Sequence, residues 1–94
     1  MDLRGGTFKR AGFHLADLRE AKFEGSDLDG AVFWHADVRW TDFRGAKNLT
    51  PDQIREARFW RSAYYDDDLR KKLGLADNHN QIVHRLETFL KDAP

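Results

Sequence analysis

A large apolar residue recurs at every fifth position through the first half of this 94-residue chain. The series of repeat centres is Leu3, Phe8, Phe13, Leu18, Phe23, Leu28, Phe33, Val38 and Phe43. A period of five fits neither the helical period of about 3.6 residues nor the strand period of about 2. It therefore indicates an internal repeat, in which each unit buries its apolar side only by stacking on its neighbours.

Small residues occur two positions before the centres. They are Ala11, Ala16, Ala21, Ser26, Ala31, Ala36, Thr41 and Ala46, the last of which precedes a polar centre position, Asn48. We expect the small residue and the centre to point inward, and the other three positions, which carry most of the charge, to point outward. Glycine recurs two residues after the centre, as at Gly5 and Gly25, where a turn can use a positive φ.

The repeat is clearest in Ala-Asp-Leu-Arg-Glu at 16–20 and Thr-Asp-Phe-Arg-Gly at 41–45. These units resemble the pentapeptide-repeat family, whose consensus reads Ala-(Asp/Asn)-(Leu/Phe)-x-x, and the resemblance covers residues 1–47. It implies a mostly β fold, a right-handed quadrilateral β-helix in which one pentapeptide forms each side. A coil would then take about twenty residues, and the repeats would make about two coils.

The signs of the charges give an independent check on this coil length. Residues twenty apart would stack like residues on neighbouring strands, where opposite charges contribute a few tenths to about 1 kcal/mol. The columns that alternate in sign are Asp2/Lys22/Asp42 and Arg4/Glu24/Arg44. The exceptions are Asp17 over Asp37 and Arg19 over Arg39, but these two columns flank one side and could pair with each other.

A helical segment is predicted after the repeats. Thr50-Pro51-Asp52-Gln53 reads as a capping box with proline at the first helical position, and we expect a helix from there to about Tyr64. A second helix over 68–73 would end at Gly74, and a third would run to about Lys91. The third carries an apolar stripe, namely Ile82, Val83, Leu86, Phe89 and Leu90. The chain thus divides into a β-helix, 1–47, and a C-terminal helical cap, 48–94, packed as one unit.

The segment from Asn48 to Leu75 resembles the helical tail of some bacterial, notably cyanobacterial, family members. In those proteins the tail looks like a cap on the open end of the β-helix. A cap is needed because the last coil would expose unpaired backbone groups and apolar centres that recruit other chains. We expect four residues to cover the Phe43 end. They are Ile54, Phe59, Trp60 and Leu69.

No equivalent segment covers the N-terminal end, where Met1 already lies inside the repeat. Three explanations stay open at this point. The chain is a fragment of a longer repeat, its first coil is frayed, or two chains form a homodimer by stacking end to end about a two-fold axis.

One side of the expected β-helix is free of charge on its outer positions. The residues of this candidate interaction patch are His14, Leu15, Val32, Trp34, His35 and, on the next side, Trp40. Exposed aromatic patches usually mark contact surfaces. The alternative is that the C-terminal helices fold back over this side.

The sequence offers little support for catalysis or for a cofactor. The chain has no cysteine, no glycine-rich phosphate loop and no nucleophile elbow. His14 and His35 could be neighbours on adjacent coils, but no third zinc ligand is evident, and His79 and His84, five residues apart, do not share one helical face. The run Asp66-Asp67-Asp68 is better explained as a helix N-terminus. We therefore expect no catalytic, metal or cofactor-binding residues.

The balance of charge narrows the classes of partner that this chain could bind. Sixteen basic and sixteen acidic residues give a net charge of zero, so nucleic acid, which prefers a basic face, is an improbable partner. No apolar run approaches a membrane span and no signal peptide is evident, which suggests a cytoplasmic protein if the chain is complete.

These observations favour a non-enzymatic scaffold or protein–protein interaction module with an unknown protein partner. Some members of the family that the repeats resemble mimic DNA and protect DNA gyrase, which is the alternative function. That mimicry needs a long, strongly acidic surface, and this chain is neutral and short.

Overall fold

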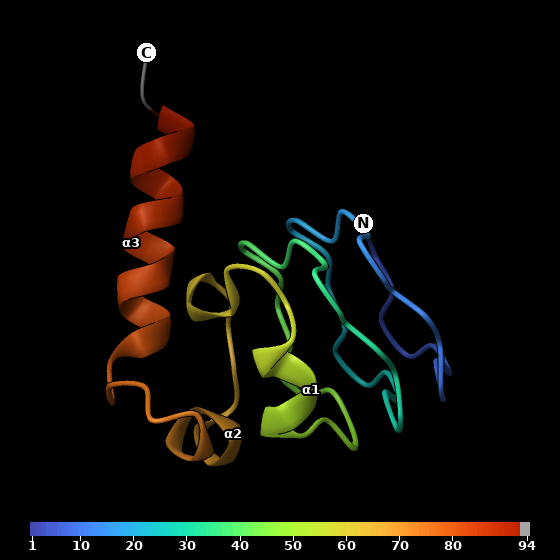
Figure 1. Cartoon of the computed structure of the whole chain (residues 1–94). Coiled ribbons are helices and arrows are strands. Elements are labelled where there is room, and N and C mark those ends of the chain that lie inside the picture. Colours follow the sequence, from blue (N-terminus) through green and yellow to red (C-terminus); the bar gives the residue numbers. More distant parts are fainter. Residues whose placement is uncertain (93–94) are drawn as a thin grey trace.

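The computed structural model describes residues 1–92, which form a ladder of turns followed by four helical segments (Figure 1). The helices are α1 (Pro51–Arg55), the 3-10 turn η1 (Trp60–Ser62), α2 (Asp67–Lys72) and α3 (His79–Asp92). The ladder and α3 lie at opposite ends of the molecule, with α1 and α2 between them. None of the helices in this range is both long and apolar enough to span a bilayer.

Parallel bridges between residues twenty apart hold the ladder together. They join Asp2 to Lys22, Thr7 to Asp27, Gly12 to Val32, Asp17 to Asp37, Lys22 to Asp42 and Asp27 to Lys47. Within residues 1–92 these bridges are isolated, and no longer strand forms. The chain therefore returns to the same side every twenty residues and winds a β-helix.

A tight turn makes each corner. The amide of Ala16, for example, donates to the carbonyl of Phe13 at 3.1 Å. At every corner of the ladder, the residue before the donating amide has a positive φ. It is either a glycine, such as Gly25, or a residue with a side chain, such as Leu15 or His35. A left-handed residue other than glycine costs roughly 1–2 kcal/mol, and the bridges on either side of the corner hold it in place.

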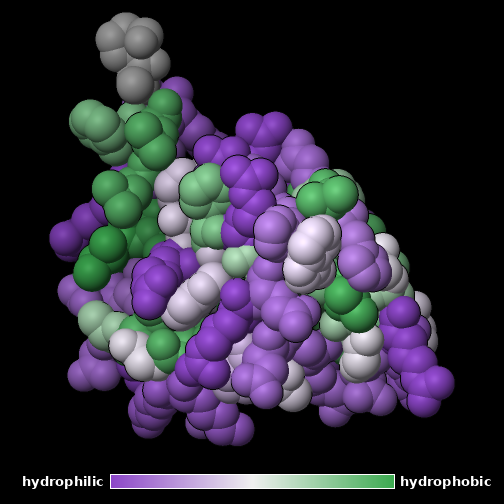
Figure 2. Space-filling view, viewed as in Figure 1, coloured by the Kyte–Doolittle hydropathy of each residue, from purple (hydrophilic) through white to green (hydrophobic). Residues whose placement is uncertain are grey.

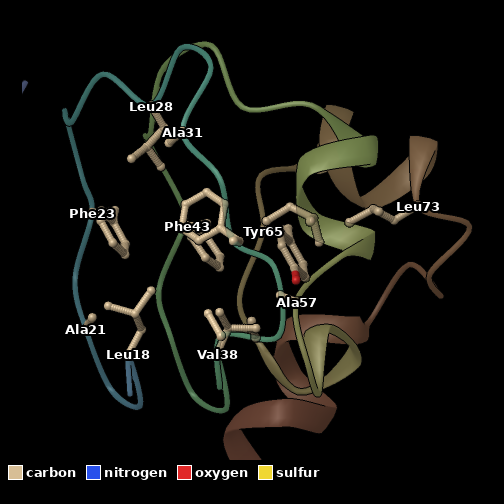
Figure 3. Close-up of a cluster of buried hydrophobic side chains, with 14 residues drawn as sticks. Leu18, Ala21, Phe23, Leu28, Ala31, Val38, Phe43, Ala57, Tyr65 and Leu73 are labelled. Carbon is tan, nitrogen blue, oxygen red and sulfur yellow. The ribbon is translucent and has the colours of Figure 1, made fainter. Parts of the chain in front are cut away.

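Two columns of aromatic rings run through the interior beside Leu18, Leu28 and Val38, and Figure 3 shows the column of Phe23, Phe43 and Tyr65. Phe13 stacks on Phe33, and Phe23 stacks on Phe43, each with ring centroids 5.3 Å apart. The two columns meet edge to face, which is a favoured arrangement of aromatic rings. The predicted inward positions therefore form the core of the β-helix.

Burial of the centres falls off toward the N-terminus. The fully buried centres are Leu18, Phe23, Leu28, Phe33, Val38 and Phe43. Leu3, Phe8 and Phe13 are only partly buried, because the first coil has a neighbour on one side alone. The two polar residues among the small inward positions are satisfied, since Ser26 Oγ donates to Leu3 O at 2.5 Å and Thr41 Oγ1 donates to Leu18 O at 2.6 Å.

The prediction of a helix from Pro51 to about Tyr64 was wrong, because α1 ends at Arg55. The following residues extend and add two more bridges to the ladder, Asp37 to Arg58 and Asp42 to Tyr64. The amides of Arg58 and Tyr64 donate to carbonyls of the last coil at 2.8 and 2.9 Å. These hydrogen bonds to the backbone of the last coil outweigh the helical propensity of the segment.

Tyr65 completes this extra layer. Ala57 and Ala63 lie at the inward small positions, and the fully buried Tyr65 ring stacks on Phe43 with centroids 5.8 Å apart. The Tyr65 hydroxyl donates to Trp60 O at 2.5 Å, and burial raises the pKa of this phenol. The aromatic column of the β-helix thus continues into the C-terminal segment.

The capping box at the start of α1 is confirmed. The Gln53 amide donates to Thr50 Oγ1 at 3.3 Å, and the Thr50 amide donates to Gln53 Oε1 at 2.8 Å. Gln53 Nε2 also donates to the carbonyls of Leu28 and Ala31 at 2.9 and 2.8 Å. Gln53 therefore completes the capping box and also fastens α1 to the edge of the ladder.

Polar contacts fix α2 and α3. Asp66 precedes α2, but its carboxylate accepts from the Gly45 amide at 2.8 Å rather than capping the helix. The buried Arg70 donates to Leu75 O at 3.0 Å, just after Gly74, whose φ of 74° ends the helical turn. At the start of α3, the Asn80 side chain pairs with both backbone groups of Tyr65 at 3.1 and 2.7 Å.

We predict that Tyr65→Ala lowers the free energy of unfolding by about 3–5 kcal/mol, because it removes a fully buried ring from the end of an aromatic column. Tyr65→Phe keeps the stack and loses one hydrogen bond, so its cost is expected near 1 kcal/mol. Urea denaturation followed by circular dichroism measures both. Equal losses in the two variants would contradict the importance of the stack.

Candidate interaction surfaces

The patch predicted from the uncharged outer positions is largely exposed. The indole of Trp34 is 47% exposed and stacks on the His35 ring, with centroids 4.0 Å apart. Leu15 lies at the corner one coil earlier and is 68% exposed, and His14 is also exposed, while Val32 is half-buried. Within residues 1–92 the C-terminal helices leave Trp34 and Leu15 uncovered. We call His14, Leu15, Val32, Trp34 and His35 the aromatic side.

Trp40 is set apart from the aromatic side. It is half-buried and lines a cleft of about 640 Å³ between the ladder and α3. The other residues that line this cleft are Glu20, Lys22, Asp42, Arg44, Tyr64, His84, Glu87 and Lys91. The sequence analysis grouped Trp40, on the next side, with the uncharged outer positions around Trp34, but Trp40 faces the helical segment.

Ion pairs occupy much of that cleft. Lys91 Nζ lies 3.0 Å from Glu20 and 2.9 Å from Glu87, so it links α3 to the ladder. The Tyr64 hydroxyl donates to Glu87, and the Arg44 guanidinium lies 5.0 Å from the centre of the Tyr64 ring. Burial, followed by the bond to Glu87, raises the pKa of Tyr64. The cleft therefore works as a polar contact between α3 and the β-helix.

The apolar stripe of α3 is a second exposed surface. Val83 is buried, but Phe89 is 70% exposed and Leu90 is 57% exposed, and Ile82 and Leu86 are exposed as well. Figure 2 shows hydrophobic surface gathered along α3. We call Ile82, Leu86, Phe89 and Leu90 the α3 face. Amphipathic stripes usually face their own core, and here only the first turns of the helix reach it.

The four expected cap residues lie in different places. Ile54 is fully buried, and Trp60 and Leu69 pack partly buried against the core. The expectation for Phe59 was wrong, because its ring is 45% exposed with Arg39 and Arg58 at 4.6 and 5.2 Å from the ring centre. Phe59 has a φ of 61° at a sharp bend, and this turns its ring outward.

The charged sides are built mainly from Asp-x-Arg forks, and one ion pair, Lys9 to Asp27 at 3.7 Å, joins two coils. Arg19 Nε and Nη2 donate to the two carboxylate oxygens of Asp17 at 2.9 and 2.8 Å. The same two-point pairing joins Asp2 to Arg4, Asp37 to Arg39 and Asp42 to Arg44. Most ion pairs within the ladder thus run along a side, although the stacked register itself is as predicted.

The histidines do not converge on a metal. His79 is buried, and its Nε2 donates to Ala63 O at 2.8 Å, so it forms part of the contact between α3 and the β-helix. In the part of the chain described here, no group of three or more His, Cys, Asp or Glu side chains is placed to hold a metal ion.

Comparison with known proteins agrees with the repeat. Residues 2–34 and 11–47 match the family described as pentapeptide repeats, in eight copies. No curated protein matches the chain significantly. Among solved structures, the chain is similar to "Structure of QnrB1 (M102R-Trypsin Treated), a plasmid-mediated fluoroquinolone resistance protein", at 21% identity and a TM-score of 0.26. That match covers 80% of this chain and 44% of the QnrB1 chain.

The Asp-x-Arg forks predict a loss of stability in acid. Hydrogen bonds from Arg19 lower the pKa of Asp17 to about 2, whereas an unfolded aspartate titrates near 3.9. A lowered pKa in the folded state stabilises it above about pH 4, and this stability is lost as the pH falls toward about 2. We therefore expect the free energy of unfolding to decrease over this range.

Asp17→Asn should flatten this decrease, as measured by urea unfolding at a series of pH values. Asp29→Asn is the matched control, because the Asp29 carboxylate makes no ion pair or side-chain hydrogen bond within residues 1–92. An unchanged pH slope in Asp17→Asn would show that the fork does not couple to folding.

Proposed function

Because the N-terminal half of this chain belongs to the pentapeptide-repeat family, we propose that the protein is a non-enzymatic scaffold whose aromatic side binds a protein partner. The observation that carries this proposal is the exposed Trp34 on the uncharged side of a rigid ladder. In its finer form the proposal includes about two right-handed, four-sided coils with a helical cap packed on them as one unit. The twenty-residue register of the bridges supports that form.

The geometry of Trp34 suits a binding hot spot. Tryptophan is enriched among residues that dominate binding energy, particularly where the surrounding contacts exclude water. The Trp34 indole already rests on the His35 ring, with the planes 15° apart, and the His35 amide is fixed by the carbonyl of Glu56 at 2.9 Å. A side chain held in place in this way loses little conformational entropy on binding.

The charge distribution supports a protein rather than a nucleic acid as the partner. The chain has no net charge, and the outer positions of the aromatic side carry no formal charge apart from the histidines. Arg70, one of the three basic residues in the last turn of α2, is buried and pairs with Asp67 and Asp77. A surface that recognises phosphates needs free cations.

The polar groups of the cleft support a non-enzymatic role. Lys91 and Tyr64, which could act as acid or base, are engaged with Glu87 and so join α3 to the ladder. Neither is paired with a nucleophile, so this arrangement favours a structural use of the cleft.

The test is capture of a partner by the immobilised protein from a lysate of its own organism, followed by titration calorimetry with the purified partner. We expect Trp34→Ala to weaken that affinity by about 30-fold or more, which corresponds to a hot-spot loss of about 2 kcal/mol.

Phe59→Ala is the matched control, because Phe59 is an aromatic residue of similar exposure that lies against Arg39 on the next, charged side and is not part of the aromatic side. The control should bind like the wild type. A partner that binds Trp34→Ala as tightly as it binds the wild type would contradict the proposal.

A further inference from the structure

Helix α3 carries two separate surfaces. On one side, Val83 is buried and Asn80 bonds to the backbone of Tyr65. Glu87 and Lys91, on the same side, join the helix to the ladder. At 3.6 residues per turn, the α3 face is centred roughly 120° around the helix from this packed side. A partner could therefore occupy the α3 face without displacing α3 from the ladder.

The apolar residues of the α3 face follow the spacing of a seam between two helices. Ile82, Leu86 and Phe89 lie four and then three residues apart, which is the alternation of the a and d positions in a coiled coil. Leu90 lies beside them at the e position. Within residues 1–92 all four are exposed. A helix packed along this seam would bury the stripe that the ladder leaves uncovered.

Opposite charges flank the seam on its other side. Arg85 and Asp92 occupy the two g positions of this pattern, one heptad apart, and both are exposed. Within residues 1–92 the ion pairs of α3 all involve Lys91, so neither Arg85 nor Asp92 forms one there. Charges at e and g positions set the choice and the orientation of a partner helix.

We propose that the α3 face is the interface of a homodimer, in which the α3 helices of two copies pack antiparallel about a two-fold axis. When Leu86 lies beside the partner subunit's Phe89, the axis also places Phe89 beside the partner subunit's Leu86. The same register brings Arg85 next to the partner subunit's Asp92, and Asp92 next to the partner subunit's Arg85. The surface is therefore complementary to itself in its apolar pattern and in its charge.

A parallel arrangement fits these residues less well. It would place Arg85 next to the partner subunit's Leu90 and would leave Asp92 without an opposite charge. It would also align the two helix dipoles, whereas antiparallel helices bring opposite dipole ends together. The charges of α3 thus favour the antiparallel pair.

The helix is already formed before a partner binds. A helix of 14 residues is marginal on its own in water, but here the buried Val83 and His79 fix it to the β-helix, with His79 Nε2 donating to Ala63 O at 2.8 Å. Association therefore does not have to cover the entropy of ordering the helix.

The area of the α3 face is that of a reversible interface. Its four residues are between 41% and 70% exposed, so at about 200 Å² for a fully exposed residue of this kind they leave roughly 450 Å² accessible in each copy. With the flanking Arg85 and Asp92, the dimer would bury about 1,000 Å² in total, the size at which specific interfaces begin. We therefore expect a Kd on the order of 10–100 µM.

Sedimentation velocity from about 1 µM to about 1 mM tests the proposal. The wild type should shift from the 11.0 kDa monomer to a species of twice that mass. Leu86→Ser combined with Phe89→Ser removes two side chains from the seam and should stay monomeric over the whole range. Because both residues are exposed, the circular dichroism of this variant should match that of the wild type.

A matched control removes apolar area from a different surface. Leu15→Ser combined with Trp34→Ala takes two exposed apolar side chains from the aromatic side, and this variant should dimerise like the wild type. Loss of the dimer in the control, or a dimer that persists in the Leu86→Ser, Phe89→Ser variant, would overturn the proposal.

Exchange of the two flanking charges tests the antiparallel register. Arg85→Glu and Asp92→Arg each place like charges opposite each other twice in the dimer, so each should weaken it about 5-fold or more. The two substitutions combined restore opposite charges across the axis and should return the Kd to within about 2-fold of the wild type. A combined variant weaker than either single one, or a wild type that is monomeric at every concentration, would contradict the proposal.

Discussion

The stacking of each residue on the one twenty positions later is the constraint on which the rest of the structure depends. It places Phe23 under Phe43 and Phe13 against Phe33, and so runs two columns of rings through the core. It also sends the residues between the centres outward, which puts Trp34 and its His35 neighbour on the surface. A slip of one residue would reverse inside and outside on every side at once, because neighbouring residues of an extended segment point to opposite faces. The corner residues with positive φ, including Leu15 and His35, are tolerated because this register fixes them.

The repeat was predictable because almost every pentapeptide unit carries the same pattern of a small residue and a large apolar centre. The centres and small residues occupy the inward positions that the five-residue period assigned to them. The capping box at Thr50 was also predictable, since it is a local motif with a local mechanism. The conformation of the segment after Arg55 was not predictable, because it is set by backbone hydrogen bonds to a coil that is distant in sequence. One signal could have revealed it: Ala63-Tyr64-Tyr65 repeats the small–outer–large order of a pentapeptide unit.

The candidate surfaces, too, were predictable from the sequence only in part. The absence of charge around Trp34 was visible in the sequence, and the exposure of this side follows from the register. Trp40 was grouped with it by composition, but the placement of α3 separates the two. An amphipathic stripe such as the α3 face shows that a helix has an apolar side, without showing whether the covering partner belongs to the same chain.

The central claim is that the C-terminal segment acts as a further layer of the ladder, joined through Arg58, Tyr64 and Tyr65. Native-state hydrogen exchange with increasing denaturant tests it most directly, because it measures the free energy of opening at each amide. The account predicts that the amides of Arg58 and Tyr64 open with the same free energy as those of Asp37 and Asp42 in the coil beneath them. Exchange of Arg58 and Tyr64 at a much lower opening free energy, while Asp37 and Asp42 stay protected, would contradict it.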